Sequence, residues 1–520
     1  MQQSIVSEAR AGQPMTNVLH AFAAVAVTVV IFLAVYNLTE YPLTWFDEGS
    51  HLHVPKTFVR LGVYADYSSD GFRYYGPTIG VGPTVLLPIA LIFKFFGVGL
   101  FQARLVMAVY LLGCVYMFFR LAGEMGGTRL AWAATALVVA SRGVGMLEYG
   151  RQVLGEVPGF FFIGAGLAVW FATWEKTGWR RLVLVGLLLG LAMVTKYQYL
   201  LVLAPAIGLA WIANLVYYRT APHRVFIIPG LVAGVCFALW QVYLILYLGP
   251  ATASENFAEL RQAASGAAMV FSPSLMQRAM GELTSFKVYM GMLLPAVIYG
   301  VALALPRHRD GQRWGVLAIL AVANLVWYVV ASVSWLRYAF LGMAVASLFL
   351  ARLFYDLTDG FQMEGKVVWE ALRRGQPAAQ RHVLRWTLLA WLMVMIILPL
   401  GKTTLEIVQP EFNAPTAMAA YLDENVPREA LIETWEPEMG FLTDHNYHFP
   451  PSELLAKAVS YIWSSAPPPS QFYDFVQTQQ PEYVLVGEFA RWVELYPDDW
   501  LADHYRLVTR IGAYDFYSLR

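Results

Sequence analysis

The sequence predicts an all-α polytopic membrane domain followed by a small soluble α/β domain. Of the 520 residues, 58% are hydrophobic and only 14% are charged, whereas about a quarter of a typical soluble domain is charged. Uncharged apolar runs of about the length that crosses a bilayer recur up to residue 400, and in lipid such runs satisfy their backbone polar groups as helices. Residues 411–520 lack these runs and hold 17 acidic against six basic side chains, a composition that predicts a solvated domain.

The composition also excludes several classes of protein. The 36 Lys and Arg residues balance 36 Asp and Glu residues, so no net positive field is available to bind nucleic acid. The abundance of apolar residues excludes an intrinsically disordered chain. Cys114 and Cys236 both lie inside apolar runs, which indicates two small core residues and not a disulfide scaffold.

The predicted membrane domain covers residues 1–402. Its first apolar run, 18–38, is long and has no obvious small-residue cleavage site, so we interpret it as a membrane anchor and not as a signal peptide. The other runs lie at 79–96, 101–119, 130–140, 155–174, 182–194, 199–218, 225–248, 288–305, 314–332, 338–355 and 386–400.

Basic loops between the runs predict the orientation in the membrane. They lie at 120–129, 176–181, 219–224, 307–313 and 366–385, and the positive-inside rule places all of them in the cytoplasm. Two neighbouring cytoplasmic loops must be joined by an even number of spans. Between a cytoplasmic N-terminus and the first basic loop, the number is even only if one apolar run does not cross the membrane.

We therefore predict that 79–97 is a juxtamembrane helix in the outer leaflet and that the chain has about eleven spans. The chain is then a multi-pass protein of the plasma or inner membrane. Its N-terminus is cytoplasmic, its first extracytoplasmic loop is 39–78, and its C-terminal domain, 403–520, is extracytoplasmic.

The pattern of residues 403–520 is that of a small α/β domain. Helical spacing occurs at 415–424 and 453–463. Strands are predicted at 430–434, 483–487 and 506–517. The polar segment 444–448 is predicted to be a surface loop.

Candidate catalytic residues occur in the first outer loop. Asp47 and Glu48 are adjacent there, with aromatic residues before them and His51 and His53 after them. A carboxylate at an apolar border gains proton affinity, which a nearby cation lowers again, and this suits a general base acting on a hydroxyl or amine. The alternative is a pair of solvated loop acids. Two histidines do not complete a metal site, and we expect neither a metal nor another cofactor.

The segment around Asp47 and Glu48 resembles a motif of a known enzyme class. Trp45–His51 is similar to the Asp-Glu motif in the first extracytoplasmic loop of the GT-C glycosyltransferases, especially the protein O-mannosyltransferases and the lipid A aminoarabinose transferases. Other elements of these enzymes are matched in order by Leu61–Tyr64, Gly82–Pro88, Ala103–Leu105, Thr195–Tyr197 and Trp335–Tyr338. A C-terminal α/β domain is usual in one branch, so the resemblance covers nearly the whole chain and implies a GT-C-like fold.

The resemblance implies an integral membrane hexosyl- or pentosyltransferase. Such an enzyme moves a sugar from a polyprenyl-phosphate-linked donor to an acceptor hydroxyl or amine on the extracytoplasmic side. Asp47 would be the base, and Glu48 would orient or bind the acceptor or the sugar. A monophosphate leaving group paired with Lys or Arg can dispense with a metal, and a single in-line displacement is inverting. A protein, a glycolipid and a cell-wall glycan all remain open as acceptors.

A second candidate carboxylate lies at another predicted outer membrane end, where an ionisable residue is a functional candidate. Glu156 opens the run 155–174, and Arg151 precedes it by five residues. The resemblance places Glu156 near the active centre, whereas the alternative is a structural pair between Arg151 and Glu156. Arg104 is expected to anchor its helix to the interface.

Several cations are candidates for binding the donor phosphate. Lys196 and Arg337, the latter followed by Tyr338, lie at predicted outer helix ends, but such side chains can also simply reach toward lipid headgroups. Related transferases often carry a lysine beside a Pro-Pro pair in the first loop; here either Arg73 or His53 replaces it, or another loop donates the cation. At that place the sequence reads Arg73-Tyr74-Tyr75-Gly76-Pro77.

Three other functions remain open on the sequence. One is a transporter or lipid-binding membrane protein, which the clustering of charges at one face disfavours, because transporters bind near the bilayer midplane. Another is an oligosaccharyltransferase-like enzyme with a pyrophosphate donor and a metal. The last is a structural subunit with a degenerate site.

Overall fold

The computed structural model describes residues 21, 23–74, 80–172, 174, 178–361, 378–464 and 466–520. Several stretches of the predictions lie outside this range: residues 18–20 and 22 of the predicted anchor, residues 75–78 of the first loop, and parts of the basic loops 176–181 and 366–385.

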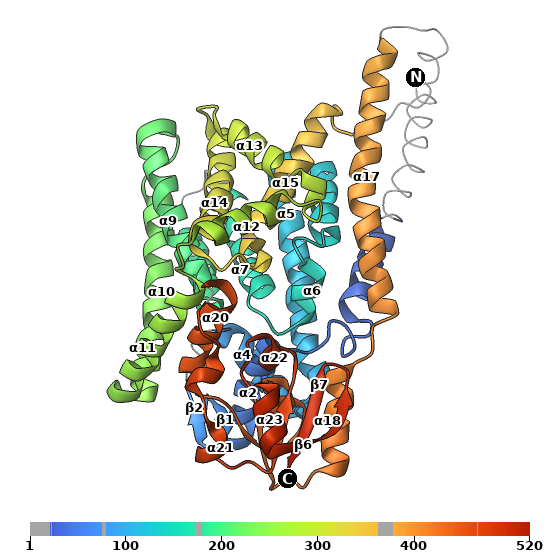
Figure 1. Ribbon diagram of the computed structural model, residues 1–520. Coiled ribbons are helices and arrows are strands. Elements are labelled where there is room, and N and C mark those ends of the chain that lie inside the picture. The colour runs from blue at the N-terminus through green and yellow to red at the C-terminus, as the bar shows by residue number, and fades with distance from the viewer. Residues whose placement is uncertain are drawn as a thin grey trace.

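The described membrane region is a bundle of helices that run side by side, with the C-terminal region at one end (Figure 1). Among the described residues, six helices are long and apolar enough to cross a membrane: Leu100–Ala140, Gln198–Tyr218, Arg224–Leu248, Arg309–Ala331, Leu336–Leu357 and Arg381–Val408. Shorter apolar helices lie at Ala23–Val35, Pro83–Phe96, Glu156–Ala172 and Leu293–Ala304. The chain is therefore a multi-pass integral membrane protein.

The helices and strands before residue 409, including those just named, carry the following labels. They are α2 (Phe46–Leu61), β1 (Asp66–Ser68), β2 (Gly71–Arg73), α4 (Pro83–Phe96), α5 (Leu100–Ala140), α6 (Met146–Arg151), α7 (Glu156–Ala172), α8 (Trp179–Thr195), α9 (Gln198–Ala213), η1 (Asn214–Tyr218), α10 (Arg224–Leu248), α11 (Pro250–Ala267), α12 (Pro273–Thr284), η2 (Tyr289–Gly291), α13 (Leu293–Ala304), α14 (Arg309–Ala331), η3 (Leu336–Ala339), α15 (Phe340–Leu357) and α17 (Ala378–Val408).

Helix α5 is two antiparallel arms and not one long rod. Gly126 and Gly127 have non-helical backbone angles, and φ is +81° at Gly127. The rings of Phe119 and Trp132 are 5.0 Å apart, although a straight helix would separate their backbones by about 20 Å. The two apolar runs predicted at 101–119 and 130–140 therefore form a hairpin, which turns at the glycine pair.

Helix α15 lies at the centre of the bundle, whereas α17 lies at its edge. Residues 338–351 are buried on every face of α15, as expected of an apolar helix enclosed by others. In contrast, Ile397 and Leu398 of α17 are 55% and 62% exposed, which fits a helix that packs against lipid. Helix α17 continues to Val408, beyond the predicted domain limit at residue 402, because none of the intervening residues breaks a helix.

One end of α4 contacts the end of α8, and the other contacts the C-terminal region. Gly82, before the first turn, donates its N–H to the carbonyl of Thr195, at 2.9 Å, and Thr195 ends α8. Near the other end, the Phe93 ring stacks 6.1 Å from that of Phe441. The helix begins at Pro83, whose ring is compatible with a first helical turn.

The C-terminal region is built on a five-stranded mixed sheet in the order β4-β3-β5-β7-β6. Strand β3 is parallel to β4 and β5, and β7 is antiparallel to β5 and β6. Its elements are α18 (Ala414–Asn425), β3 (Leu431–Thr434), α19 (Pro437–Leu442), β4 (Asn446–His448), α20 (Glu453–Ser464), η4 (Pro469–Phe472), α21 (Phe475–Thr478), β5 (Tyr483–Val486), α22 (Glu488–Trp492), α23 (Asp498–His504), β6 (Tyr505–Ile511) and β7 (Tyr514–Leu519).

Most of the elements predicted for this region are present, but the loop predicted at 444–448 is wrong. Residues 446–448 form the edge strand β4, in which Tyr447 and His448 are buried. His448 contacts the buried carboxylate of Glu433 and, through Nε2, the Asp70 carboxylate at 3.0 Å. A strand of three residues is too short to show an alternation of apolar and polar residues, and long-range pairing creates it.

Helix α2 of the first loop docks directly on α19 of the C-terminal region. A Cβ at Gly49 would lie 2.3 Å from the backbone nitrogen of Glu438, so this close approach requires glycine. Lys56 completes the contact by donating to the carbonyl oxygens of Gly440 and Thr443, both at 2.7 Å. The first turn of α2, which carries Asp47, is thereby held between the membrane bundle and the C-terminal region.

Candidate active site

Asp47 forms an ion pair with Arg337. Asp47 lies in the first turn of α2, and Arg337 lies in η3, immediately before α15. The rings of Trp45, Trp335 and Tyr338 surround the guanidinium, with centroids 5.7, 4.9 and 5.6 Å from its central carbon. Such cation–π contacts orient the cation, so the arginine has a defined position beside Asp47.

A second ion pair joins Glu156 to Lys196. Glu156 is the first residue of α7, and Lys196 follows the last residue of α8. Their side chains are only 3% and 11% exposed, and a buried carboxylate of this kind depends on its cation. The hydroxyl of Tyr199 donates to the carbonyl oxygen of Glu156 at 2.6 Å, which fixes the start of α7.

The two ion pairs influence each other electrostatically. Burial alone would raise the pKa of the Asp47 carboxyl, but Arg337, then His51 and Lys196, outweigh it and hold the pKa below its ordinary value. Burial has the opposite effect on a base, and it lowers the pKa of His51 below its ordinary value. Asp47 is therefore ionised and His51 uncharged at neutral pH. His51 also hydrogen-bonds through Nδ1 to the carbonyl oxygen of Val153, at 2.7 Å.

The two ion pairs, Asp47 with Arg337 and Glu156 with Lys196, form one charged cluster. Glu48 does not join this cluster, although it adjoins Asp47 in the sequence. Its carboxylate accepts bonds from Arg104 Nε at 2.9 Å and Nη2 at 2.5 Å, and from the backbone nitrogen of Val153 at 3.0 Å. Glu48 and Arg104 are both fully buried. The expectation that Arg104 anchors its helix to the interface is therefore wrong, because its side chain crosses to Glu48 and fixes α2 against α5.

Arg151, Arg73 and His53 also lie outside the cluster. Arg151 donates to the carbonyls of Tyr36, Asn37 and Tyr41, at 2.7, 3.0 and 3.0 Å, and so gathers acceptors at the end of the first helix. It makes no described ion pair with Glu156. Arg73 pairs with Asp66 at 3.1 Å, and His53 hydrogen-bonds to the carbonyl of Pro437 at 2.8 Å.

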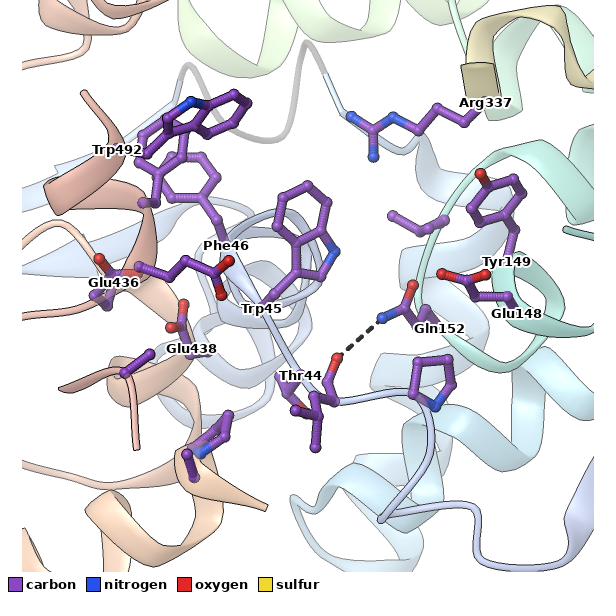
Figure 2. Close-up of a pocket in the computed structure, with 18 of the residues that line it drawn as sticks. Thr44, Trp45, Phe46, Glu148, Tyr149, Gln152, Arg337, Glu436, Glu438 and Trp492 are labelled. Carbon is purple, nitrogen blue, oxygen red and sulfur yellow. Dashed lines mark hydrogen bonds between the residues drawn. The ribbon is translucent and has the colours of Figure 1, made fainter. Parts of the chain in front are cut away.

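Arg337 of the cluster lines a cavity of about 560 Å³. One side is formed by Arg337, Tyr149, Glu148 and Gln152, and the opposite side by residues of the C-terminal region, with Trp45 between them (Figure 2). The acidic residues of the far side had no individual signal in the sequence. Their only sign was the acidic surplus of residues 411–520, which solvation also explains.

Among the described residues, no group of three or more His, Cys, Asp or Glu side chains is placed to hold a metal ion. The charges of the cluster are instead arranged as two carboxylates and two fixed cations, a set that can bind an anionic group and accept a proton.

Comparison with known proteins shows which family and which folds the chain is similar to. Residues 81–243 match the family model of the dolichyl-phosphate-mannose-protein mannosyltransferases. No curated protein matches the chain by sequence.

Solved structures share the fold over almost the whole chain. ArnT from Cupriavidus metallidurans bound to undecaprenyl phosphate has a TM-score of 0.60 and 14% identity, over 97% of this chain and 98% of that one. Its apo form gives 0.61 and 15% over the same shares. The oligosaccharyltransferase AglB from Archaeoglobus fulgidus, in complex with an inhibitory peptide and a dolichol-phosphate, gives 0.55 and 13%, over 96% and 74%.

The predicted resemblance is thereby confirmed. The chain has the ArnT-like fold, a helical membrane domain followed by a C-terminal mixed sheet, and its residues 81–243 match a mannosyltransferase family model.

Proposed function

We propose that this enzyme transfers a sugar from a polyprenyl-phosphate-linked donor to an acceptor on the extracytoplasmic side of the membrane. The observation that carries the proposal is the cluster of Asp47, Arg337, Glu156 and Lys196, which joins α2, η3, α7 and the end of α8 and whose Arg337 lines a cavity. ArnT, which shares the fold, binds undecaprenyl phosphate, and this supports a polyprenyl phosphate as the carrier.

In the proposed reaction, Arg337 and Lys196 bind the phosphate of the donor, while Asp47 accepts a proton from the acceptor. The acceptor oxygen or nitrogen forms a bond to the anomeric carbon as the bond from that carbon to the phosphate oxygen breaks. The bonding electrons leave with the polyprenyl phosphate, whose charge the two cations stabilise. A single displacement of this kind inverts the anomeric centre, and the fixed cations supply the positive charge.

The resting ion pairs suit this reaction. A bound phosphate competes with Asp47 for Arg337 and with Glu156 for Lys196. Because Arg337 holds the pKa of Asp47 low, sharing this cation with phosphate raises the proton affinity of the carboxylate. Donor binding therefore converts Asp47 from an ion-pair partner into a base.

Glu48 and Tyr338 act as positioning residues in this proposal. Glu48 fixes α2 through Arg104, and the Tyr338 ring packs beside Arg337. Arg151, Arg73 and His53 are engaged elsewhere, so we assign the phosphate to Arg337 and Lys196.

Binding of undecaprenyl phosphate tests this assignment. We expect Arg337→Met and Lys196→Met each to weaken its binding to the purified enzyme by roughly ten- to a hundredfold, because each removes a charge-assisted hydrogen bond. Isothermal calorimetry in detergent measures the change, with the thermal midpoint as a check on folding.

Arg73→Met is the matched control, because Arg73 pairs with Asp66 in the β1–β2 hairpin. Its affinity for undecaprenyl phosphate should equal that of the wild type. Loss of binding in this control, with normal binding in the other two variants, would place the phosphate in the first loop and overturn the assignment.

We further propose eleven spans, with a cytoplasmic N-terminus, a membrane domain over residues 1–402 and an extracytoplasmic domain over 403–520. The hairpin in α5 supplies two of these spans, and the contacts at both ends of α4 support a juxtamembrane helix that does not cross.

Cysteine labelling tests this topology. Asp310 and Asp499 are exposed and fall on opposite sides of the membrane in the proposed arrangement. With Cys114 and Cys236 replaced by serine, an impermeant maleimide added to spheroplasts should label Asp499→Cys and leave Asp310→Cys unlabelled until the membrane is permeabilised. The reverse pattern would invert the proposed orientation.

A further inference from the structure

Two carboxyl groups of the C-terminal region are buried on the far wall of the cavity, and the proposed chemistry of the donor does not use them. Glu436 and Glu438 flank Pro437 at the start of α19, and both line the cavity across from Arg337 (Figure 2). They are only 2% and 1% exposed. Burying two acids side by side is costly, so their position calls for a partner.

The protein supplies only part of what these acids need. Glu436 accepts from the backbone nitrogen of Ala490 at 2.9 Å, and Glu438 accepts from the hydroxyl of Tyr514 at 2.8 Å. Glu438 Oε2 is buried and has no hydrogen-bond donor in the described part of the chain. Neither carboxyl has a described ion pair.

Burial raises the pKa of Glu438 to about 7, and burial together with the neighbouring Glu438 raises the pKa of Glu436 above its ordinary value. Perturbed carboxyl groups that face a cavity are typical of functional sites. Within this pair, Glu438 Oε2 is the oxygen that can still form a hydrogen bond with a ligand in the cavity.

Aromatic rings lie beside these acids. Trp45 and Trp492 line the cavity and are 37% and 45% exposed. The ring of Trp335 stacks on that of Trp492 at 6.5 Å, with an angle of 26° between the planes. The face of an indole ring carries a partial negative charge. An exposed indole face therefore attracts the weakly positive C–H groups on one face of a pyranose ring.

The charges of the lining indicate which acceptors fit. Glu148, Glu436, Glu438 and Glu488 all line the cavity, while its cation Arg337 is already paired with Asp47. Because the pKa of Glu436 and of Glu438 is raised, the negative charge of this wall is partial, but a phosphate or carboxylate on the acceptor would still face carboxyl groups whose ionised forms repel it. Hydroxyl groups, in contrast, can donate to carboxylates, which only accept when ionised.

We propose that this cavity is the acceptor site of the enzyme and that it binds an uncharged, hydroxyl-rich glycan unit. Glu436 and Glu438 accept hydrogen bonds from its hydroxyls, and Trp45 and Trp492 stack on its ring. This inference rests on the proposed function, because one acceptor hydroxyl must reach Asp47 beside Arg337. The volume of the cavity is in the range of small-molecule sites.

The test uses the full-length purified enzyme and saturation-transfer NMR. The probes are methyl α-mannoside, methyl β-glucoside and methyl β-galactoside as neutral glycosides, glucose 6-phosphate as an anionic sugar, and acetyl-Ala-Thr-Ala-amide as a protein-like acceptor. We expect saturable binding of at least one neutral glycoside, and no binding of the phosphorylated sugar or the peptide.

Two variants and their controls locate the binding. Glu438→Gln and Trp492→Leu should weaken binding of the neutral glycoside by about tenfold or more, and the thermal midpoint of each variant checks that it is folded. Glu424→Gln and Trp179→Leu change exposed residues outside the cavity and should leave binding unchanged.

Four outcomes would overturn the proposal: binding of no glycoside, preference for glucose 6-phosphate, binding of the peptide alone, or equal binding by Glu438→Gln and wild type. Undecaprenyl phosphate is titrated into the same preparations. If it still binds in an Arg337-dependent way, only the acceptor assignment fails; if it does not bind to the wild type, the proposed function itself fails.

Discussion

Asp47→Asn is expected to abolish sugar transfer while leaving the enzyme folded and able to bind undecaprenyl phosphate. Asparagine has the shape of aspartate but cannot take up the acceptor proton, and a general base contributes about 10²- to 10⁴-fold to the rate. The measurement is the initial rate of transfer of labelled sugar from a polyprenyl-phosphate donor by purified protein.

Affinity for undecaprenyl phosphate, the carrier without its sugar, provides the internal control. A damaged site would bind it more weakly, whereas this variant should not. Asp47 competes with phosphate for Arg337, so its neutralisation should leave undecaprenyl phosphate binding equal or tighter. Asp499→Asn, at an exposed position, should be fully active. Full turnover by the folded Asp47→Asn enzyme would exclude Asp47 as the base.

The pH dependence of the wild type provides a second readout of the same assignment. In the free enzyme the pKa of Asp47 lies below its ordinary value because of Arg337, after the opposing effect of burial. Once phosphate shares that cation, the pKa rises. The acid limb of kcat, which reports the donor complex, should therefore lie at higher pH than the acid limb of kcat/KM, which reports the free enzyme. Coincident limbs would contradict the proposed exchange.

Arg104→Met is expected to be the most destabilising of the single substitutions considered. It leaves the carboxylate of Glu48 fully buried without its cation, and breaking a buried pair in this way costs about 3–5 kcal/mol. The thermal midpoint of the purified protein in mild detergent should fall strongly. Transfer activity should fall with it, because Glu48 and Arg104 hold the turn that carries Asp47.

Two controls separate the lost charge from lost packing. Arg142→Met breaks the partly exposed pair of Arg142 with Glu406, 2.6 Å apart, and should cost less than about 1 kcal/mol. The double variant Arg104→Met with Glu48→Gln removes both buried charges and should recover much of the stability. Equal midpoints for Arg104→Met and Arg142→Met would show that the buried pair is not important for the fold.

The sequence predicted the architecture because hydropathy reports the local environment. Apolar runs indicated the membrane helices. The change of composition in residues 411–520 indicated a small α/β domain, and the strands predicted at 430–434 and 483–487 are β3 and β5. The Asp-Glu motif and its companion elements indicated the class of enzyme. Very short elements such as β4 could not be predicted, because three residues are too few to show an alternation of apolar and polar side chains.

The partners of the charged residues could not be predicted in the same way. Asp47 and Glu48 are neighbours in the chain, but successive helical residues point about 100° apart, so one meets Arg337 and the other meets Arg104. Arg151 and Glu156 are close in sequence and make no pair in the structure. The buried position of Glu436 and Glu438 was hidden within a surplus of acidic residues that suggested solvation.

The sequence alone thus determined that this chain is a multi-pass membrane protein with a distinct acidic C-terminal region and a GT-C-like outer loop. Composition, periodicity and short motifs depend on residues near one another in the chain, and they are readable from it. Only the tertiary structure decided which charges meet, and which carboxyl groups face the cavity and which brace the fold. The physical reason is that an ion pair or a cavity wall forms between segments hundreds of residues apart, and its geometry depends on how all the helices pack.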